Sequence, residues 1–195
     1  KKGGELIKFD RVLANPPFSL DYDDKTLTFK HRFSRGYAPT NKRADLMFVQ
    51  HMHSVLKDDG MMATVIPHGV LFRGGGEKEI RSAFVDEDLI EAIISLPENL
   101  FYGASIGACI LVMRAKGAKP ADRKGKVLFI NADREYDSGR AQNYLRPEHI
   151  EKIANTFDAF KDVEGYAKVV TIQNLQEEEY SSAQCPRVTA INIIC

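Results

Sequence analysis

The sequence predicts an α/β fold with a mixed, mostly parallel sheet and an antiparallel final hairpin. Short, almost wholly apolar runs alternate with segments of helical periodicity, which is typical of buried parallel strands joined by helices. In the second half, two apolar runs follow each other with a connection too short for a helical crossover, so they predict an antiparallel pair. The chain has 195 residues, of which 44% are hydrophobic, enough for one domain with a sizeable core.

The bounds of the first strand and the first helix are predicted from the residues that end each apolar run. A strand is expected at Phe9–Ala14, because this run ends at two prolines, which lack the N–H that a sheet needs. A helix is expected at Asp45–Lys57, where apolar residues recur at helical spacing behind Asp45 as the N-cap. The sequence DDG at 58–60 then predicts the end of this helix, with Gly60 as a left-handed cap.

The later elements continue the alternation of strands and helices. Two of the strands, 89–96 and 106–113, form the antiparallel pair predicted from their short connection. The expected elements are a strand at Met61–Ile66, a helix at Glu77–Val85, strands at Leu89–Leu96 and Ile106–Met113, an edge strand at Val127–Ile130, a helix at Pro147–Phe160 and a strand at Tyr166–Ile172.

The turn after the first strand, Asn15-Pro16-Pro17-Phe18, holds the candidate chemistry. Ligands of open α/β sheets bind beyond the carboxyl ends of strands, which is where this stiff turn lies. Asn15 offers a side-chain carbonyl and Pro16 a backbone carbonyl with no competing N–H, so the two acceptors suit a planar NH₂ group. Phe18 offers an aromatic face to a planar ring. The alternative is a structural diproline turn with a phenylalanine in the core.

The segment at 25–43 carries basic side chains and no acidic one, although the formal net charge of the whole chain is zero. A basic loop directly after the candidate turn can bind phosphates, and the alternative is an ordinary solvated loop. Its basic residues are Lys25, Lys30, Arg32, Arg35, Lys42 and Arg43.

The composition indicates neither export nor a membrane protein. No apolar run approaches the ~20 residues of a membrane span, and the start, KKGGELIK, lacks the hydrophobic region of a signal peptide, so a cytoplasmic protein is expected. The three cysteines lack metal-site spacing, and His51 and His53 lie on different faces of their helix, so no metal site is expected. The missing initiator methionine predicts a partial or processed chain.

In combination, these motifs resemble the N6-adenine DNA methyltransferases, and more closely the modification subunits of type I restriction-modification systems. The resemblance covers roughly residues 5–175. It rests on the strand followed by NPPF, on RADLMFVQHMHSVLKDDGMMATVIPHGVLFRGGGEKEIR, on LIEAIISLPENLFYGASIGACILVM and on GKVLFINA. It implies the carboxyl-terminal part of a Rossmann-like S-adenosylmethionine-dependent methyltransferase fold.

The resemblance implies roles at the target base, which must be flipped out because N6 inside a duplex cannot reach a methyl donor. Asn15 and Pro16, within the motif completed by Pro17, would accept hydrogen bonds from the adenine N6 amino group. Phe18 would stack on the adenine, and Phe101 would contact it from another side.

The same resemblance implies one further role, and the basic segment described above supplies the expected contacts to DNA. Phe48 would lie near the adenine of the cofactor, whereas the alternative for Phe48 and Phe101 alike is core packing. The residues expected to bind DNA are Lys30, Arg32, Arg35, Lys42 and Arg43.

The sequence departs from the family at both ends. The glycine-rich loop that holds the cofactor lies upstream of the NPPF strand in this subfamily, and only eight residues precede Phe9. Residues 1–175 are therefore expected to form a partial catalytic domain that lacks this half, and 176–195 a disordered or non-native tail. The unpartnered Phe9–Ala14 edge is expected to self-associate or to be covered by the chain termini.

The implied function is transfer of a methyl group from S-adenosylmethionine to adenine N6 in DNA, although the chain alone is expected to be inactive. The partners would be DNA and the specificity and restriction subunits of a type I complex. Two alternatives stay open: methylation of RNA or of a protein glutamine, since the same turn suits any planar amine, and a non-catalytic assembly module.

Overall fold

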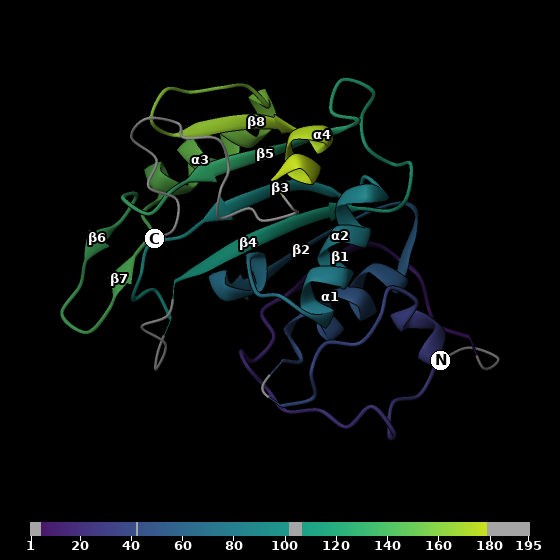
Figure 1. Cartoon of the computed structure of the whole chain (residues 1–195). Helices are drawn as coiled ribbons and strands as arrows, with labels where there is room; N and C mark the ends of the chain where they lie inside the picture. Colours follow the sequence, from purple (N-terminus) through teal and green to yellow (C-terminus); the bar gives the residue numbers. More distant parts are fainter. Residues whose placement is uncertain (1–4, 42, 102–106, 179–195) are drawn as a thin grey trace.

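The computed structural model describes residues 5–41, 43–101 and 107–178. Their framework is a six-stranded sheet in the order β1-β2-β4-β3-β5-β8 (Figure 1). Four strands, β1, β2, β3 and β5, run in one direction and β4 and β8 run in the other, which confirms the mixed, mostly parallel sheet. The strands span Phe9–Ala14 (β1), Leu56–Pro67 (β2), Ile90–Ser95 (β3), Ala108–Arg114 (β4), Lys126–Asn131 (β5) and Ala167–Thr171 (β8).

The predicted antiparallel hairpin is present as β3 and β4, and β4 lies between β2 and β3. A second, two-stranded hairpin consists of β6 (Asp137–Ser138) and β7 (Asn143–Tyr144). The prediction of an edge strand at 127–130 was wrong, because β5 pairs with β3 on one side and β8 on the other. Its central residues are buried, as a strand covered on both faces requires.

The helices cover the sheet unequally (Figure 1). On one face lie α1 (Asp45–Ser54), α2 (Gly76–Asp86) and the short α4 (Ile172–Glu177), whereas α3 (Pro147–Ala159) packs on the other. Two 3₁₀ turns, η1 (Lys30–Phe33) and η2 (His68–Leu71), belong to the connections. None of the described helices is long and apolar enough to cross a membrane.

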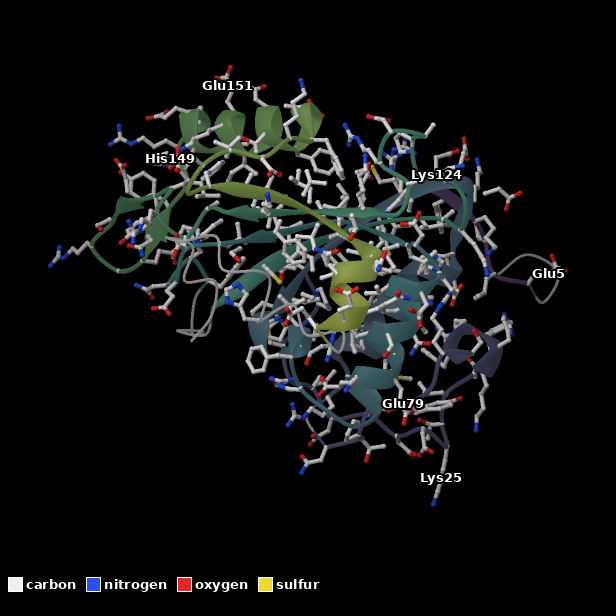
Figure 2. All side chains as sticks on the ribbon, turned by 45° about the horizontal axis from the view of Figure 1, so that its top comes forward. Glu5, Lys25, Glu79, Lys124, His149 and Glu151 are labelled. Atoms are coloured by element: carbon white, nitrogen blue, oxygen red, sulfur yellow. The ribbon has the colours of Figure 1, made fainter. Side chains whose placement is uncertain are left out.

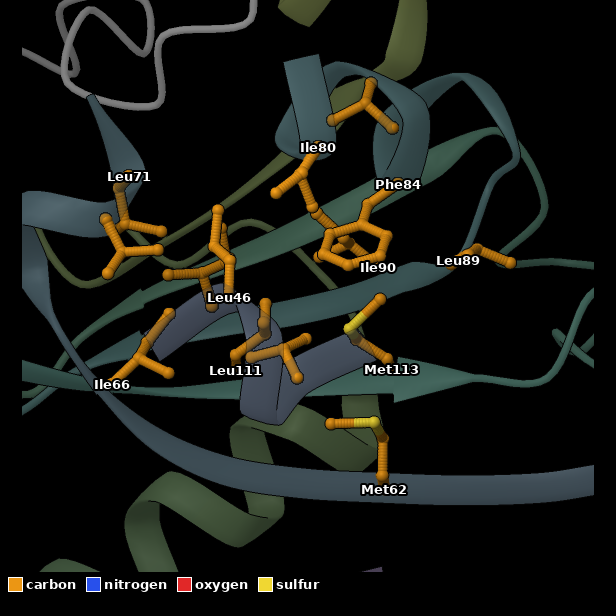
Figure 3. Packing of buried hydrophobic residues seen from close by; sticks show 14 of the residues in the cluster. Leu46, Met62, Ile66, Leu71, Ile80, Phe84, Leu89, Ile90, Leu111 and Met113 are labelled. Atoms are coloured by element: carbon orange, nitrogen blue, oxygen red, sulfur yellow. The ribbon is translucent and has the colours of Figure 1, made fainter. Parts of the chain in front are cut away.

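The larger core cluster fills the face under α1 and α2. Figure 3 shows Phe84 of α2 beside Ile90, with Leu46 of α1 close to Leu111 of β4. All four side chains are at most 4% exposed. In β4, Leu111 points to this cluster and Val112 to the cluster under α3, so the two-residue period of a strand builds both halves of the core.

The predicted end of the first helix was wrong. α1 stops at Ser54, and 58–60 belong to β2, in which Gly60 does not adopt a positive φ. Phe9 pairs with Leu56 and Arg11 with Met61, so β2 bulges between these pairs. A Cβ on Gly60 would lie 2.9 Å from the Leu56 Cβ, so the glycine permits a close approach within the bulge.

The carboxyl-terminal helix crosses the boundary expected after residue 175. α4 continues to Glu177. The Thr171 side chain accepts a hydrogen bond from the Asn174 amide and caps the start of this helix. Leu175 is buried in the larger core cluster. The expectation of a disordered tail concerns residues that, from 179 onward, lie outside the described part of the chain.

Candidate active site

The candidate turn, Asn15-Pro16-Pro17-Phe18, follows β1 at the end of the sheet where the parallel strands finish. Asn15 is exposed, and its side-chain amide makes no hydrogen bond within the described residues. The Pro16 carbonyl likewise accepts no backbone hydrogen bond there. Both acceptors predicted from the sequence can therefore receive donors from a ligand.

The structure brings Phe18 and Phe101 together from two loops that are far apart in the sequence. Their ring centroids lie 6.0 Å apart at an interplanar angle of 79°, an edge-to-face arrangement. Both side chains are half-buried. The aromatic pair therefore includes the last residue of the turn that carries the two acceptors.

The downstream side of the turn is attached to the start of α1. The Ser19 amide donates a hydrogen bond to Asp45 Oδ1 over 3.0 Å, and the Ala44 amide donates to the Leu20 carbonyl over 3.1 Å. The N-cap of α1 is Ala44 and not the predicted Asp45. The Asp45 carboxylate is turned to the Ser19 amide instead, so it caps the candidate turn rather than its own helix.

Buried charges lie behind this attachment. Arg73 Nη1 lies 3.8 Å from Asp45 Oδ2 and 3.4 Å from Glu77 Oε1, and Arg43 Nη1 lies 3.2 Å from Glu77 Oε2. Both carboxylate side chains are only 2% exposed. Burial raises the pKa of Glu77 above its ordinary value, although the Arg73 and Arg43 guanidiniums act in the opposite direction. The cluster connects the starts of α1 and α2 beneath the turn.

The loop that carries Phe101 is attached to the β6–β7 hairpin. Asn143 Nδ2 donates to the Glu98 carbonyl over 2.9 Å, and the Asn143 amide donates to the Asn99 carbonyl over 2.9 Å. Figure 1 shows this hairpin beyond the end of the sheet at which β3 and β5 finish. The hairpin thus supports the second aromatic residue of the pair.

His68 follows β2 at the same end of the sheet. Its amide donates to the Gly107 carbonyl over 3.0 Å, and a Cβ on Gly107 would lie 2.7 Å from His68 Nδ1. Burial lowers the pKa of the imidazole, whereas the Glu98 and Asp133 carboxylates act to raise it. His68 therefore packs as a largely desolvated ring on the residue that leads into β4.

The basic segment is more engaged within the chain than the sequence indicates. Arg35 forms a bidentate ion pair with Glu87, in which Nε donates to Oε1 over 2.7 Å and Nη2 donates to Oε2 over 2.9 Å. Arg32 Nη1 lies 2.8 Å from His51 Nδ1. Together with the Arg43–Glu77 pair, these contacts give three of the predicted DNA-binding residues an internal structural role.

The lysines of the segment are less engaged within the chain than these arginines. Lys30 in η1 is exposed and forms no ion pair within the described residues, and Lys25 points away from the body of the molecule (Figure 2). Lys42 lies outside the described residues. Cationic surface for a ligand is therefore available at Lys25 and Lys30.

Comparison with known proteins decides the family. The sequence matches the family model of the N-6 DNA methylases over residues 1–190. The chain belongs to the N-6 DNA methylase family. It is 42% identical over 181 residues to the MjaVIII methylase subunit, a type I restriction enzyme subunit of Methanocaldococcus jannaschii. It is 37% identical over 176 residues to the MpnII methylase subunit of Mycoplasma pneumoniae.

A solved structure of the same family agrees with the fold. The methyltransferase subunit of a type I restriction-modification system from Streptococcus thermophilus superposes with a TM-score of 0.81 at 35% identity, over 93% of this chain and 38% of its own. The fold is that of class I S-adenosylmethionine-dependent methyltransferases, as the resemblance implied. The match to the Methanocaldococcus protein covers 89% of this chain and 31% of that relative, so this N-6 DNA methylase sequence spans about a third of its length.

In this N-6 DNA methylase, one side chain and one strand bear on the expected cofactor site. Phe48 of α1 is half-buried and belongs to neither core cluster, which is compatible with a contact to a bound ligand. β1, however, is an edge strand, and no glycine-rich loop lies beside it within the described residues. Phe9 and Leu13 of β1 are 48% and 80% exposed. Within the described residues, Phe48 is therefore partly accessible, and β1 has no neighbouring strand on its outer side.

Sequence reasoning missed Asp45 and Asn143 as supports of the candidate turn and of the Phe101 loop. Each hydrogen-bonds to backbone groups of a distant segment, and such contacts leave no motif. The sequence predicts Asp45 only as a helix cap. An acidic residue at the expected start of a helix was the one available signal, and it pointed to the amides of its own helix rather than to the Ser19 amide.

Proposed function

We propose that this chain is the target-base part of an adenine-N6 DNA methyltransferase of a type I restriction-modification system. The observation that carries the proposal is the Phe18–Phe101 pair beside the two acceptors of Asn15 and Pro16. The family and its relatives, which are methylase subunits of type I restriction enzymes, support DNA as the substrate. They favour DNA over RNA or protein glutamine and a catalytic over an assembly role.

The proposed mechanism uses hydrogen bonds and packing rather than a strong base. The Asn15 side-chain carbonyl and the Pro16 carbonyl accept the two N6 hydrogens of a flipped adenine, which leaves the nitrogen lone pair directed at a methyl donor. As N6 attacks, it gains positive charge, which the two carbonyl dipoles stabilise. Phe18 and Phe101 hold the ring in place. The methylated nitrogen is acidic, so it then gives one proton to bulk water.

S-adenosylmethionine would supply the methyl group in the full-length protein. Phe48 is the only described residue that we assign to it, and we propose that the remaining contacts come from parts outside this chain. DNA, a specificity subunit that chooses the sequence and a restriction subunit are the proposed partners of the full-length protein.

The direct test is a methyl-transfer assay of the full-length protein with its specificity subunit, on DNA from a host that lacks the modification. Labelled S-adenosylmethionine should place its label on adenine N6. A protein that binds the cofactor and the DNA but transfers no label would support the assembly-module alternative. Label on RNA or glutamine, with none on DNA, would support the other alternative.

Among the basic residues, we propose that Lys30 contacts DNA phosphate. Lys30→Ala in the full-length protein should weaken DNA binding and lower the slope of log K against log salt by about 1. Arg35→Ala should leave this slope unchanged, since Arg35 already pairs with Glu87, and should instead lower the melting temperature. Binding titrations over a salt series measure both. A reduced slope for Arg35→Ala alone would contradict the assignment.

We also propose that the free edge of β1 mediates self-association of this chain when it is produced by itself. Among the described strands, β1 is the last of the sheet, and its Leu13 is 80% exposed. Leu13→Lys should shift the chain towards monomer in sedimentation experiments, because a charge on an edge strand opposes pairing. Ile150→Lys, at an exposed apolar residue of α3, is the matched control. A concentration-independent monomer of the unmodified chain would refute the proposal.

A further inference from the structure

We propose that Asp45 and Asn143 are positioning residues that fix the separation of Phe18 and Phe101, each by holding one of the two loops that carry these rings. The inference rests on the function proposed above, because it concerns the site at which the target base would lie. Neither side chain would contact the target base itself. Each acts on the backbone next to one ring.

Both loops contain a strained residue close to the aromatic ring. Ser19, directly after Phe18, has a φ of 53°, and Asn99, two residues before Phe101, has a φ of 58°. Left-handed conformations are uncommon for residues other than glycine and persist only where the surroundings hold them. The direction of each ring therefore depends on contacts that keep Ser19 and Asn99 in this region.

Asp45 supplies the contact at Ser19. Its Oδ1 accepts the Ser19 amide hydrogen over 3.0 Å, and the residue is 1% exposed, so water does not compete for the bond. The backbone bond from Ala44 to Leu20, at 3.1 Å, extends the attachment by one residue. A carboxylate that accepts from a backbone N–H forms one of the stronger hydrogen bonds in proteins.

Asn143 supplies the contacts around Asn99. Its side-chain amide binds the Glu98 carbonyl and its backbone amide binds the Asn99 carbonyl, both over 2.9 Å. Gln142 Nε2 adds a longer bond of 3.5 Å to the Leu100 carbonyl. Three consecutive carbonyls before Phe101 are thus held by two adjacent residues of the β6–β7 hairpin.

The two attachments arise from separate elements, the start of α1 and the β6–β7 hairpin, so they can be removed one at a time. Asp45→Ala removes the acceptor at Ser19. Asp45→Asn keeps an acceptor oxygen but removes the charge that faces Arg73 at 3.8 Å, so it separates the hydrogen bond from the ion cluster. Asn143→Asp removes the donor to Glu98 and keeps the size and the backbone bond.

The experiment uses the full-length protein with its specificity subunit. Hydrogen exchange of peptides that cover 15–22 and 97–101 reports on the two loops. Steady-state methyl transfer with DNA and cofactor titrations separates kcat from KM. Asp45→Ala should speed exchange in the first peptide alone, and Asn143→Asp in the second alone. Each should lower kcat by about 10- to 100-fold, as small misplacements do, with KM changed less than about twofold. Asp45→Asn should restore most of the rate.

Asp88→Ala is the matched control. Asp88 also has a left-handed φ, of 56°, and its Oδ2 accepts from the Gly125 amide over 2.9 Å, but at the opposite end of the sheet. This variant should lose stability and keep its kcat. Variants of Asp45 and Asn143 that behave like Asp88→Ala, or that leave exchange in both loops unchanged, would overturn the proposal. Altered exchange in a protein that methylates no substrate, wild type included, would uphold the positioning and refute the proposed function.

Discussion

Asn15→Ala is expected to lower kcat for methyl transfer by about 100- to 1,000-fold, which is the loss seen when one preorganised group facing transition-state charge is removed. The Asn15 amide is exposed and makes no hydrogen bond within the described residues, so its removal costs the fold little. Its carbonyl oxygen would lie beside the nitrogen that becomes positive. The KM values for DNA and cofactor should change far less than kcat.

The measurement is steady-state transfer of labelled methyl groups by the full-length protein with its specificity subunit. Asn15→Asp keeps an acceptor at the same position and should retain more activity than Asn15→Ala. Asn155→Ala, at an exposed asparagine of α3, is the control and should match the wild type. Equal rates for Asn15→Ala and Asn155→Ala would exclude Asn15 from the reaction.

Glu91→Ala is expected to cost about 3–5 kcal/mol of the free energy of unfolding, because it removes the shared partner of two arginines from the interior. Glu91 in β3 is fully buried. Its carboxylate accepts from Arg114 Nε over 2.5 Å and from Arg123 Nη1 over 3.0 Å. The side chains of these arginines are only 17% and 13% exposed, so each would keep a charge that water reaches poorly.

Urea denaturation of Glu91→Ala and of Glu91→Gln measures this effect. The exposed pair of Asp10 and Lys57, whose side chains are 64% and 49% exposed, gives the comparison. Asp10→Ala should have a much smaller effect, because solvent screens a surface ion pair. If Glu91→Ala were no more destabilising than Asp10→Ala, the buried pair would not stabilise the fold.

Local patterns were sufficient for most of the fold. Apolar runs predicted both ends of β1, β3 and β8 to within one residue, and helical periodicity predicted α2 and α3, because burial on a strand or helix repeats with a fixed period. The same reasoning failed at 58–60. A DDG sequence suits a helix end as well as a bulge, and pairing with β1 and β4 decided for the bulge.

The sequence by itself determined the candidate chemistry of this protein. The acceptors of Asn15 and Pro16 and the rings of Phe18 and Phe101 are properties of residue types at a stiff turn and in a loop. The family that these residues resemble was confirmed by the match to the N-6 DNA methylase model over residues 1–190. Such features are local, so they can be identified before any folding.

The tertiary structure alone decided which residues face each other. It placed the two rings 6.0 Å apart, turned Asp45 to Ser19 and attached Asn143 to the Phe101 loop. It also paired Arg35 with Glu87, 52 positions away, which a count of basic residues cannot foresee. Contacts between distant segments depend on how the whole chain folds. Nearly every residue carries a backbone N–H and C=O, so the residue whose backbone group is bound leaves no signal in the sequence.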